Sequence, residues 1–112
     1  MFMWLDDIRK PWDHGHIGAS WVRTAQEAIA LLKTGEVTRA SLDHDLAEDH
    51  YPWNCADLDS CAGTGYDVAR FLEENPQYLP KGGVTCHSAN PAGRERIQIA
   101  IKKAYEKLYN IA

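Results

Sequence analysis

Four short apolar runs, each followed by polar residues, set the pattern of the chain. They cover residues 2–5, 20–23, 37–42 and 83–87, and the first run ends directly in two acids. Apolar runs of this length with polar ends are typical of buried strands whose carboxyl ends meet solvent. The pattern therefore predicts four strands.

Three further segments carry apolar residues at helical spacing: residues 24–35, 64–75 and 90–108. Thr24 and Thr64 each precede an acid by three positions, which is the capping box of a helix start. Asn90 followed by Pro91 predicts the start of the last helix, because asparagine caps well and proline at the first helical position loses no needed donor.

Two segments show no sustained period. Residues 10–18 are rich in Pro, Gly and His, which predicts a loop where a helix is expected after the first strand. Residues 47–63 are acidic and predict a long loop. The resulting order, strand, loop, strand, helix, strand, helix, strand, helix, predicts an α/β fold with an open, mainly parallel four-stranded sheet flanked by helices.

Length and composition limit the class of protein. At 112 residues, the chain is expected to form a single domain spanning residues 1–112. A net charge of −4 argues against general coating of duplex DNA or of membranes, so an anionic ligand has to be captured locally. The apolar start is too short for a signal segment or a membrane span, and the three cysteines fit no paired pattern. We therefore expect a cytoplasmic protein with reduced thiols.

Chemically active side chains follow three of the predicted strands. They are Asp6, Asp7 and Arg9; Asp43, His44 and Asp45; and His87, Ser88 and Asn90, with Arg94 one turn into the last helix. Taken singly, each has a structural explanation as a cap, a turn residue or a satisfied histidine. Because ligands bind outside the carboxyl ends of parallel strands, the topology predicts one shared site.

Three of these acids, Asp6, Asp7 and Asp43, would repel one another at such a site unless a cation, a shared proton or a neighbouring cationic side chain compensates them. Magnesium with oxygen ligands is one solution, so these acids are candidate Mg²⁺ ligands. His44 and His87 could serve as acid and base near neutral pH, with Asp43 and Asp45 orienting them.

The start of the last helix predicts an anion site. Exposed amides at Asn90, together with Arg94, suit a phosphate oxygen, and Ser88 and Arg9 are further candidate phosphate ligands. Two imidazoles beside a held phosphate predict phosphoryl chemistry, in which one activates water and the other protonates the departing oxygen.

Two other groups of side chains give weaker signals. Cysteines and a histidine in the long loop fit no established zinc spacing, so a lid is the favoured interpretation there. Three tryptophans could stack on a nucleobase, although burial in the core is the commoner fate of this residue. The two groups are His50, Cys55 and Cys61, and Trp12, Trp21 and Trp53.

Four stretches, LDDIR, SLDHDL, TGYDVARFLEE and CHSANPAGR, resemble the cyclic-phosphate processing receiver domains of bacteria and their phages. The resemblance spans nearly the whole chain and implies a receiver-like (flavodoxin-like) fold. It also implies a phosphoesterase, a hydrolase acting on a cyclic phosphate of a nucleotide or of an RNA end.

The same resemblance implies roles for individual residues. Asp6 and Asp7 correspond to the metal-binding acids of a receiver, and Asp43 to its phospho-acceptor. The positions that distinguish the family from signalling receivers are matched by His44, Asp45, His87, Ser88, Asn90 and Arg94.

Other functions stay open. We expect no fifth strand with its lysine after the last helix, so the fold is truncated relative to a full receiver, and phosphorelay through Asp43 is the least favoured function. The main alternative to an enzyme is a receiver-like module that binds a nucleotide or a protein partner without turnover, for instance as a phage counter-defence factor. The sequence predicts no oligomeric state.

Overall fold

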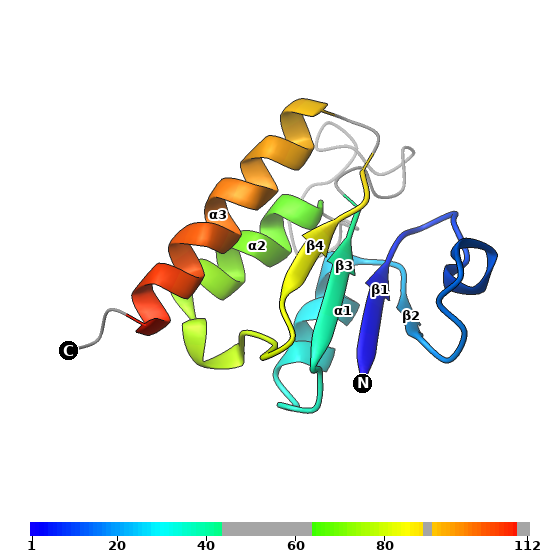
Figure 1. Cartoon of the computed structure of the whole chain (residues 1–112), viewed down its shortest axis with the longest axis horizontal. Helices are drawn as coiled ribbons and strands as arrows, with labels where there is room; N and C mark the ends of the chain where they lie inside the picture. The colour runs from blue at the N-terminus through cyan, green and yellow to red at the C-terminus, as the bar shows by residue number, and fades with distance from the viewer. Residues whose placement is uncertain (44–63, 89–90, 110–112) are drawn as a thin grey trace, which may run out of the picture.

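Four parallel strands form one sheet in the computed structural model, which describes residues 1–43, 64–88 and 91–109. They are β1 (Phe2–Leu5), β2 (Ser20–Val22), β3 (Arg39–Leu42) and β4 (Val84–Cys86), in the spatial order β2-β1-β3-β4 (Figure 1). Each lies within a predicted run. The predicted α/β fold with an open parallel sheet is confirmed, and this strand order is that of flavodoxin-like sheets.

Three α-helices connect or follow these strands: α1 (Ala25–Leu32), α2 (Gly65–Glu74) and α3 (Pro91–Tyr109). The Thr24 hydroxyl accepts a hydrogen bond from the amide of Glu27 at 3.1 Å. Thr64 and Asp67 form a complete capping box, so both predicted helix starts are confirmed. Asn90, the predicted cap of α3, lies outside the described residues. None of the helices in the described ranges is both long and apolar enough to cross a membrane.

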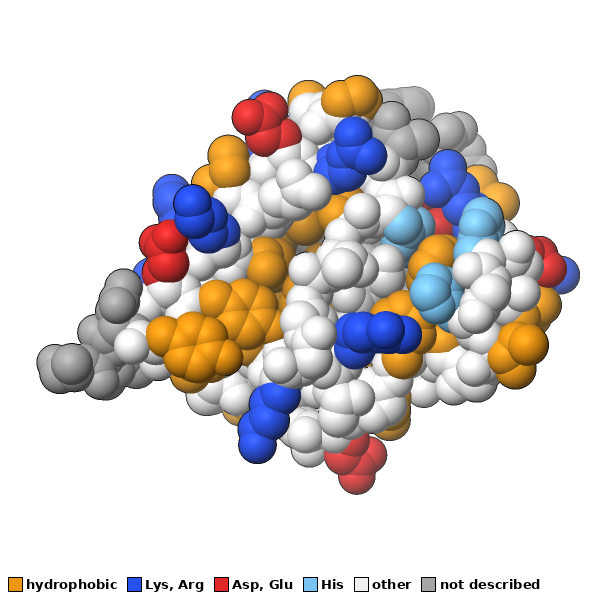
Figure 2. Space-filling model, in the orientation of Figure 1, with side chains coloured by type: hydrophobic (Ala, Val, Ile, Leu, Met, Phe, Trp, Pro, Cys, Tyr) orange, Lys and Arg blue, Asp and Glu red, His pale blue; other side chains and the backbone are white. Residues whose placement is uncertain are grey.

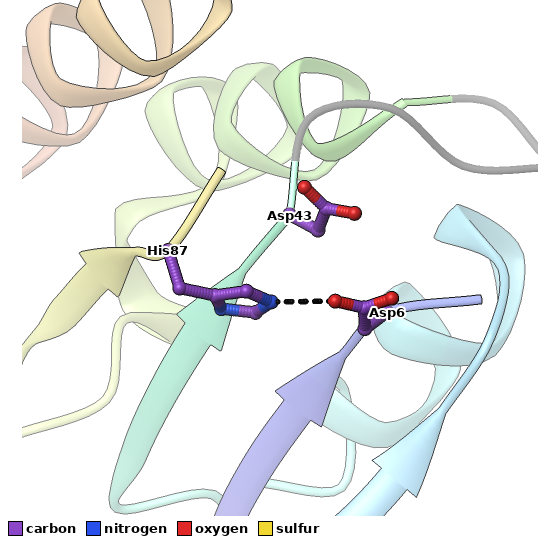
Figure 3. Close-up of side chains that lie close together, drawn as sticks. All are labelled: Asp6, Asp43 and His87. Carbon is purple, nitrogen blue, oxygen red and sulfur yellow. Dashed lines mark hydrogen bonds and ion pairs between the residues drawn. The ribbon is translucent and has the colours of Figure 1, made fainter. Parts of the chain in front are cut away.

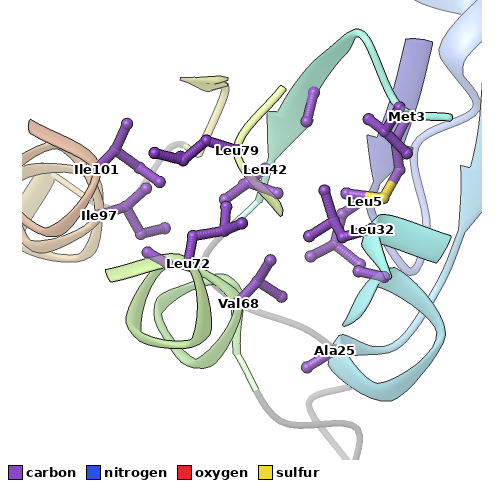
Figure 4. Packing of buried hydrophobic residues seen from close by; sticks show 14 of the residues in the cluster. Met3, Leu5, Ala25, Leu32, Leu42, Val68, Leu72, Leu79, Ile97 and Ile101 are labelled. Carbon is purple, nitrogen blue, oxygen red and sulfur yellow. The ribbon is translucent and has the colours of Figure 1, made fainter. Parts of the chain in front are cut away.

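The hydrophobic core lies on one face of the sheet. Met3 and Leu5 of β1 and Ala40 and Leu42 of β3 point to this face and are fully buried. They pack against residues of all three helices in one cluster (Figure 4), among them Leu32, Val68, Leu72, Ile97 and Ile101. Burying a side chain of this size stabilises the fold by about 1.5–3 kcal/mol. The core therefore fixes α1, α2 and α3 on the same side of the sheet.

The opposite face of the sheet is contacted by the segment between β1 and β2. His14 and His16 pack on the indole of Trp4, with ring centroids 5.6 and 5.2 Å away. The loop predicted at residues 10–18 contains one turn of 3-10 helix, Pro11–His14, which the sequence pattern missed. Proline at its first position and Gly15, whose φ is +82°, begin and end this turn.

Candidate active site

Strand register places three chemically active residues side by side at the carboxyl edge of the sheet. The last residues of β1, β3 and β4 are register partners, so the residues that follow them, Asp6, Asp43 and His87, form a row (Figure 3). One carboxylate or imidazole atom from each lies within 4.8 Å of the others. Because side chains alternate along strands, the row faces away from the hydrophobic core.

Asp6 is the most constrained member of this row. Its side chain is 1% exposed, and Oδ1 accepts hydrogen bonds from the amides of Ile8 and Arg9, both at 2.9 Å. Oδ2 lies 3.0 Å from Nε2 of His87. The indole of Trp21 donates to the Asp6 carbonyl at 2.6 Å. A buried carboxylate is tolerated when it is hydrogen-bonded in this way, and the contacts fix its orientation.

The imidazole of His87 is held at both edges and on one face. At one edge, Nε2 contacts Asp6, and at the other, Nδ1 lies 2.7 Å from Oγ of Ser41. The ring stacks on Trp4, with centroids 3.8 Å apart and planes 5° from parallel. Its backbone carbonyl accepts from Nη1 of Arg9 at 3.3 Å. These contacts define one position of the ring relative to Asp6 and Asp43.

The protonation of His87 follows from its surroundings. Burial lowers its pKa below the ordinary 6.5, while the hydrogen bond and charge of Asp6 oppose that shift, and Arg9 and His14 add to it. The ring is therefore neutral at neutral pH. A carboxylate only accepts hydrogen bonds, so Nε2 carries the hydrogen that faces Asp6 and Nδ1 accepts the Ser41 hydroxyl hydrogen.

The histidines of the described residues gather in one area. His14 and His16 contact the same Trp4 indole as His87 does. Figure 2 shows their pale blue side chains together on one part of the surface, beside apolar side chains. Neither His14 nor His16 could be given a role from the sequence, because both lie in a segment without a period.

Asp43 lies at the centre of the row and is 8% exposed. Its amide donates to the carbonyl of Leu5 at 3.0 Å, which continues the β1–β3 pairing. Burial raises the pKa of the neighbouring Cys86 thiol, a hydrogen bond from the Ser88 backbone lowers it, the charge of Asp43 raises it, and that of Arg94 lowers it. The Arg94 guanidinium thus acts on this end of β4 although its side chain is exposed.

The donor set of the row fits a divalent cation. Two carboxylates and one imidazole nitrogen within 4.8 Å of one another could share one ion. Oxygen ligands suit Mg²⁺, whereas an imidazole favours transition metals such as Mn²⁺ or Zn²⁺. Among the described residues, the third side chain of this group is that of His87 rather than the predicted Asp7. The Asp7 backbone carbonyl accepts two bonds from Arg23, and a ligand role for its carboxylate stays a prediction.

Of the remaining residues predicted from the sequence, some lie in the described part of the chain and others lie outside it. Ser88, which is 2% exposed, directly follows His87, and Arg9 is bonded to the His87 carbonyl. Trp12 and Trp21 contact each other edge to face, with centroids 5.7 Å apart. Outside the described residues lie His44, Asp45 and Asn90, together with His50, Trp53, Cys55 and Cys61.

Two residues that contact His87, Ser41 and Trp4, were missed at the level of sequence. Both have side chains on the sheet face that carries the row, and they are register partners in β3 and β1. The sequence signal for both residues is their spacing from the acids: Trp4 lies two positions before Asp6, and Ser41 lies two positions before Asp43. Side chains two positions apart in extended chain point to the same face of a sheet. That signal has meaning only when the strand order is known.

Comparison with known proteins gives a family for this chain. Neither the curated proteins nor the solved structures include a match. The family model described as the cyclic-phosphate processing receiver domain matches residues 1–103. This match covers all four strands and most of α3, and includes every residue of the row. The chain belongs to the cyclic-phosphate processing receiver domain family.

Proposed function

We propose that this protein is a phosphoesterase that opens a cyclic phosphate on a nucleotide or on an RNA end. Its family is associated by name with cyclic-phosphate processing. In the reaction, water attacks phosphorus, one P–O bond of the ring breaks, and the departing oxygen takes up a proton. Such a reaction needs a group that accepts the water proton and a group that protonates the leaving oxygen.

The observation that carries the proposal is the fixed, neutral imidazole of His87 beside two carboxylates. Its ring is oriented by Asp6 and Ser41, and burial lowers its pKa, so the ring is neutral at neutral pH. A histidine held this way is suited to move a proton near neutral pH. In this proposal His87 is one member of the acid–base pair and His44 the other, with Asp43 and Asp45 orienting the rings or sharing a cation.

Cationic groups beside the row would hold the phosphate. Arg9 is bonded to the His87 backbone, and the charge of Arg94 acts on neighbouring Cys86. Guanidinium groups bind phosphate oxygens through paired hydrogen bonds. We assign Arg9 and Arg94, with Ser88 and Asn90, to the phosphate in this proposal.

A divalent ion, if bound at Asp6, Asp43 and His87, would supply Lewis-acid activation of the phosphoryl group. An ion held through Nε2 would displace the hydrogen that this atom carries toward Asp6. The two uses of His87 therefore exclude each other within one state of the protein.

The test is turnover of 2′,3′-cyclic nucleotides and cyclic dinucleotides by the purified protein, followed by phosphorus NMR with and without Mg²⁺. We expect ring opening, and a loss of about 10²- to 10⁴-fold in kcat for His87→Gln, the range of one general acid–base group. His16→Gln is the matched control, since His16 also packs on Trp4, whereas the hydrogen bond to Asp6 among the described histidines is made by His87. Absence of hydrolysis with every substrate and both metal conditions rules the enzyme out.

A non-catalytic module that binds a nucleotide or a protein partner is the second candidate. It is favoured by the hydrogen bonding of His87, since both ring nitrogens already have partners within the chain. Calorimetry with a cyclic nucleotide separates the two functions: binding with 1:1 stoichiometry and an unchanged ligand after prolonged incubation identifies the module.

A further inference from the structure

A buried serine lies beneath the ring of His87. Ser41 of β3 is 4% exposed, and its Oγ lies 2.7 Å from Nδ1 of His87. It is the register partner of Trp4 in β1 and of Thr85 in β4, on the sheet face that carries the row. The His87 side chain extends from the end of β4 across β3 toward Asp6 (Figure 3), and its Nδ1 contacts the Ser41 side chain of β3.

Two physical reasons could place serine at this position. The first is space, because a large side chain in the middle of β3 would occupy the volume of the ring. Alanine would meet that requirement equally well. The second is the hydroxyl, because a buried ring nitrogen without a partner costs about 1–3 kcal/mol. The 2.7 Å contact with Nδ1 supports the second reason.

We infer that Ser41 is a positioning residue of His87: its hydroxyl holds Nδ1 and thereby keeps Nε2 directed at Asp6 and Asp43. This inference rests on the proposed function of His87 in proton transfer. Second-shell partners of this kind orient a functional imidazole and fix the nitrogen that carries its hydrogen.

Ser41 is not the nucleophile of this site. The sequence of contacts from Ser41 through His87 to Asp6 has the order of a serine, histidine and acid triad. However, the Ser41 side chain lies within β3 and under the ring, and it is 4% exposed. A hydroxyl buried to this degree does not suit attack on a substrate phosphorus.

The test combines a spectrum of the ring with kinetics in Ser41→Ala, which retains the space but removes the hydroxyl. In protein labelled with ¹⁵N-histidine, we expect the unmodified chain to show one tautomer, with hydrogen on Nε2. In Ser41→Ala, the Nδ1 resonance should move, and kcat on a 2′,3′-cyclic nucleotide should fall about ten- to hundredfold with little change in KM. The matched control is Thr85→Val, which removes a neighbouring hydroxyl that contacts the Ala40 carbonyl rather than His87.

Each outcome has one meaning. If the Nδ1 resonance and kcat are both unchanged in Ser41→Ala, serine only provides space at this position and the inference is wrong. A decrease in kcat that is equally large in Ser41→Ala and Thr85→Val would also overturn the inference. If the unmodified protein has no turnover, the proposed function fails while the ring spectrum still decides the role of Ser41. If Ser41→Ala does not fold, the ¹⁵N-histidine spectrum of the unmodified protein is the test. A His87 ring that exchanges between tautomers or orientations in that spectrum would overturn the inference.

Discussion

Nε2 of His87 lies 3.0 Å from Oδ2 of Asp6, although 81 positions of sequence separate the two residues. The contact spans three strands, because β3 lies between the strands that carry its partners. Asp6 is fixed by two backbone amides, and His87 by Ser41 and Trp4. The pair is therefore formed by preorganised groups, and its removal has consequences that can be measured.

Replacing Asp6 by asparagine should disrupt the orientation of His87. The asparagine side chain has the size of the native one but no charge, so the pKa of His87 should fall further once the carboxylate that raises it is gone. We expect a kcat at least about tenfold lower and a free energy of unfolding about 1–3 kcal/mol lower. Kinetics, urea denaturation and NMR titration of His87 measure these effects. Asp13→Asn, at an exposed position of the same loop, is the control; an unchanged His87 pKa in Asp6→Asn would contradict the assignment.

The stability of the protein should decrease as the pH is lowered, because of His87. Its pKa in the folded state lies below the ordinary value of 6.5, so the unfolded chain takes up this proton first as the pH falls. The contribution is complete above about pH 7 and is lost as the pH falls through 6.5 toward the folded pKa. Thermal unfolding between about pH 5 and pH 8 should give a steeper dependence for the unmodified protein than for His87→Gln. Equal slopes would show that His87 is not the group responsible.

Divalent cations should raise the melting temperature if the row of Asp6, Asp43 and His87 binds them. A ligand that binds the folded state alone stabilises it by mass action. The imidazole nitrogen favours Mn²⁺, which should act at a lower concentration than Mg²⁺. Asp43→Asn is expected to abolish the shift in differential scanning calorimetry.

Asp7→Asn is the informative comparison for that experiment. Retention of the cation effect in this variant agrees with His87 as the third ligand, and its loss would identify Asp7 as the ligand that the sequence predicts. No shift with either ion in the unmodified protein would rule out a cation at this row.

Gly65→Ala should destabilise the fold and displace Asp43. A Cβ at Gly65, the first residue of α2, would lie 1.9 Å from the carbonyl oxygen of Asp43 and 2.8 Å from its carbonyl carbon. The backbone must move, so we expect a loss of more than about 2 kcal/mol in urea denaturation. Gly15→Ala is the control: a Cβ there has open space, and the positive φ alone should cost about 1 kcal/mol. Similar losses in the two variants would contradict the close approach of α2 to Asp43.

Much of the architecture could be predicted from local patterns. The strands follow from short apolar runs that end in polar residues, and the starts of α1 and α2 from capping boxes at Thr24 and Thr64. The 3-10 turn at residues 11–14 was missed, because one turn has too few residues for a period. Strand runs and helix caps depend only on residues that are close together in the chain, so the sequence is sufficient to predict them.

The residues of the candidate site that follow strands could be predicted from the sequence, but those that lie within strands could not. Asp6, Asp43 and His87 could be predicted to meet, since each follows a strand of a parallel sheet. Ser41 and Trp4 could not be given a role, because a side chain inside a strand contacts whatever the neighbouring strands present. The pairing of Trp4 with Ser41 in register is a property of the assembled sheet.

The sequence by itself determined the elements, their order and the residue types at their ends, since periodicity, caps and turns act over a few residues. Tertiary structure alone decided that an imidazole from the fourth strand crosses the third to reach an acid on the first, with a hydroxyl under one nitrogen and an indole under its face. Strand order and register are set by burial of the whole apolar face at once. Strand order and register therefore cannot be predicted from any local sequence pattern.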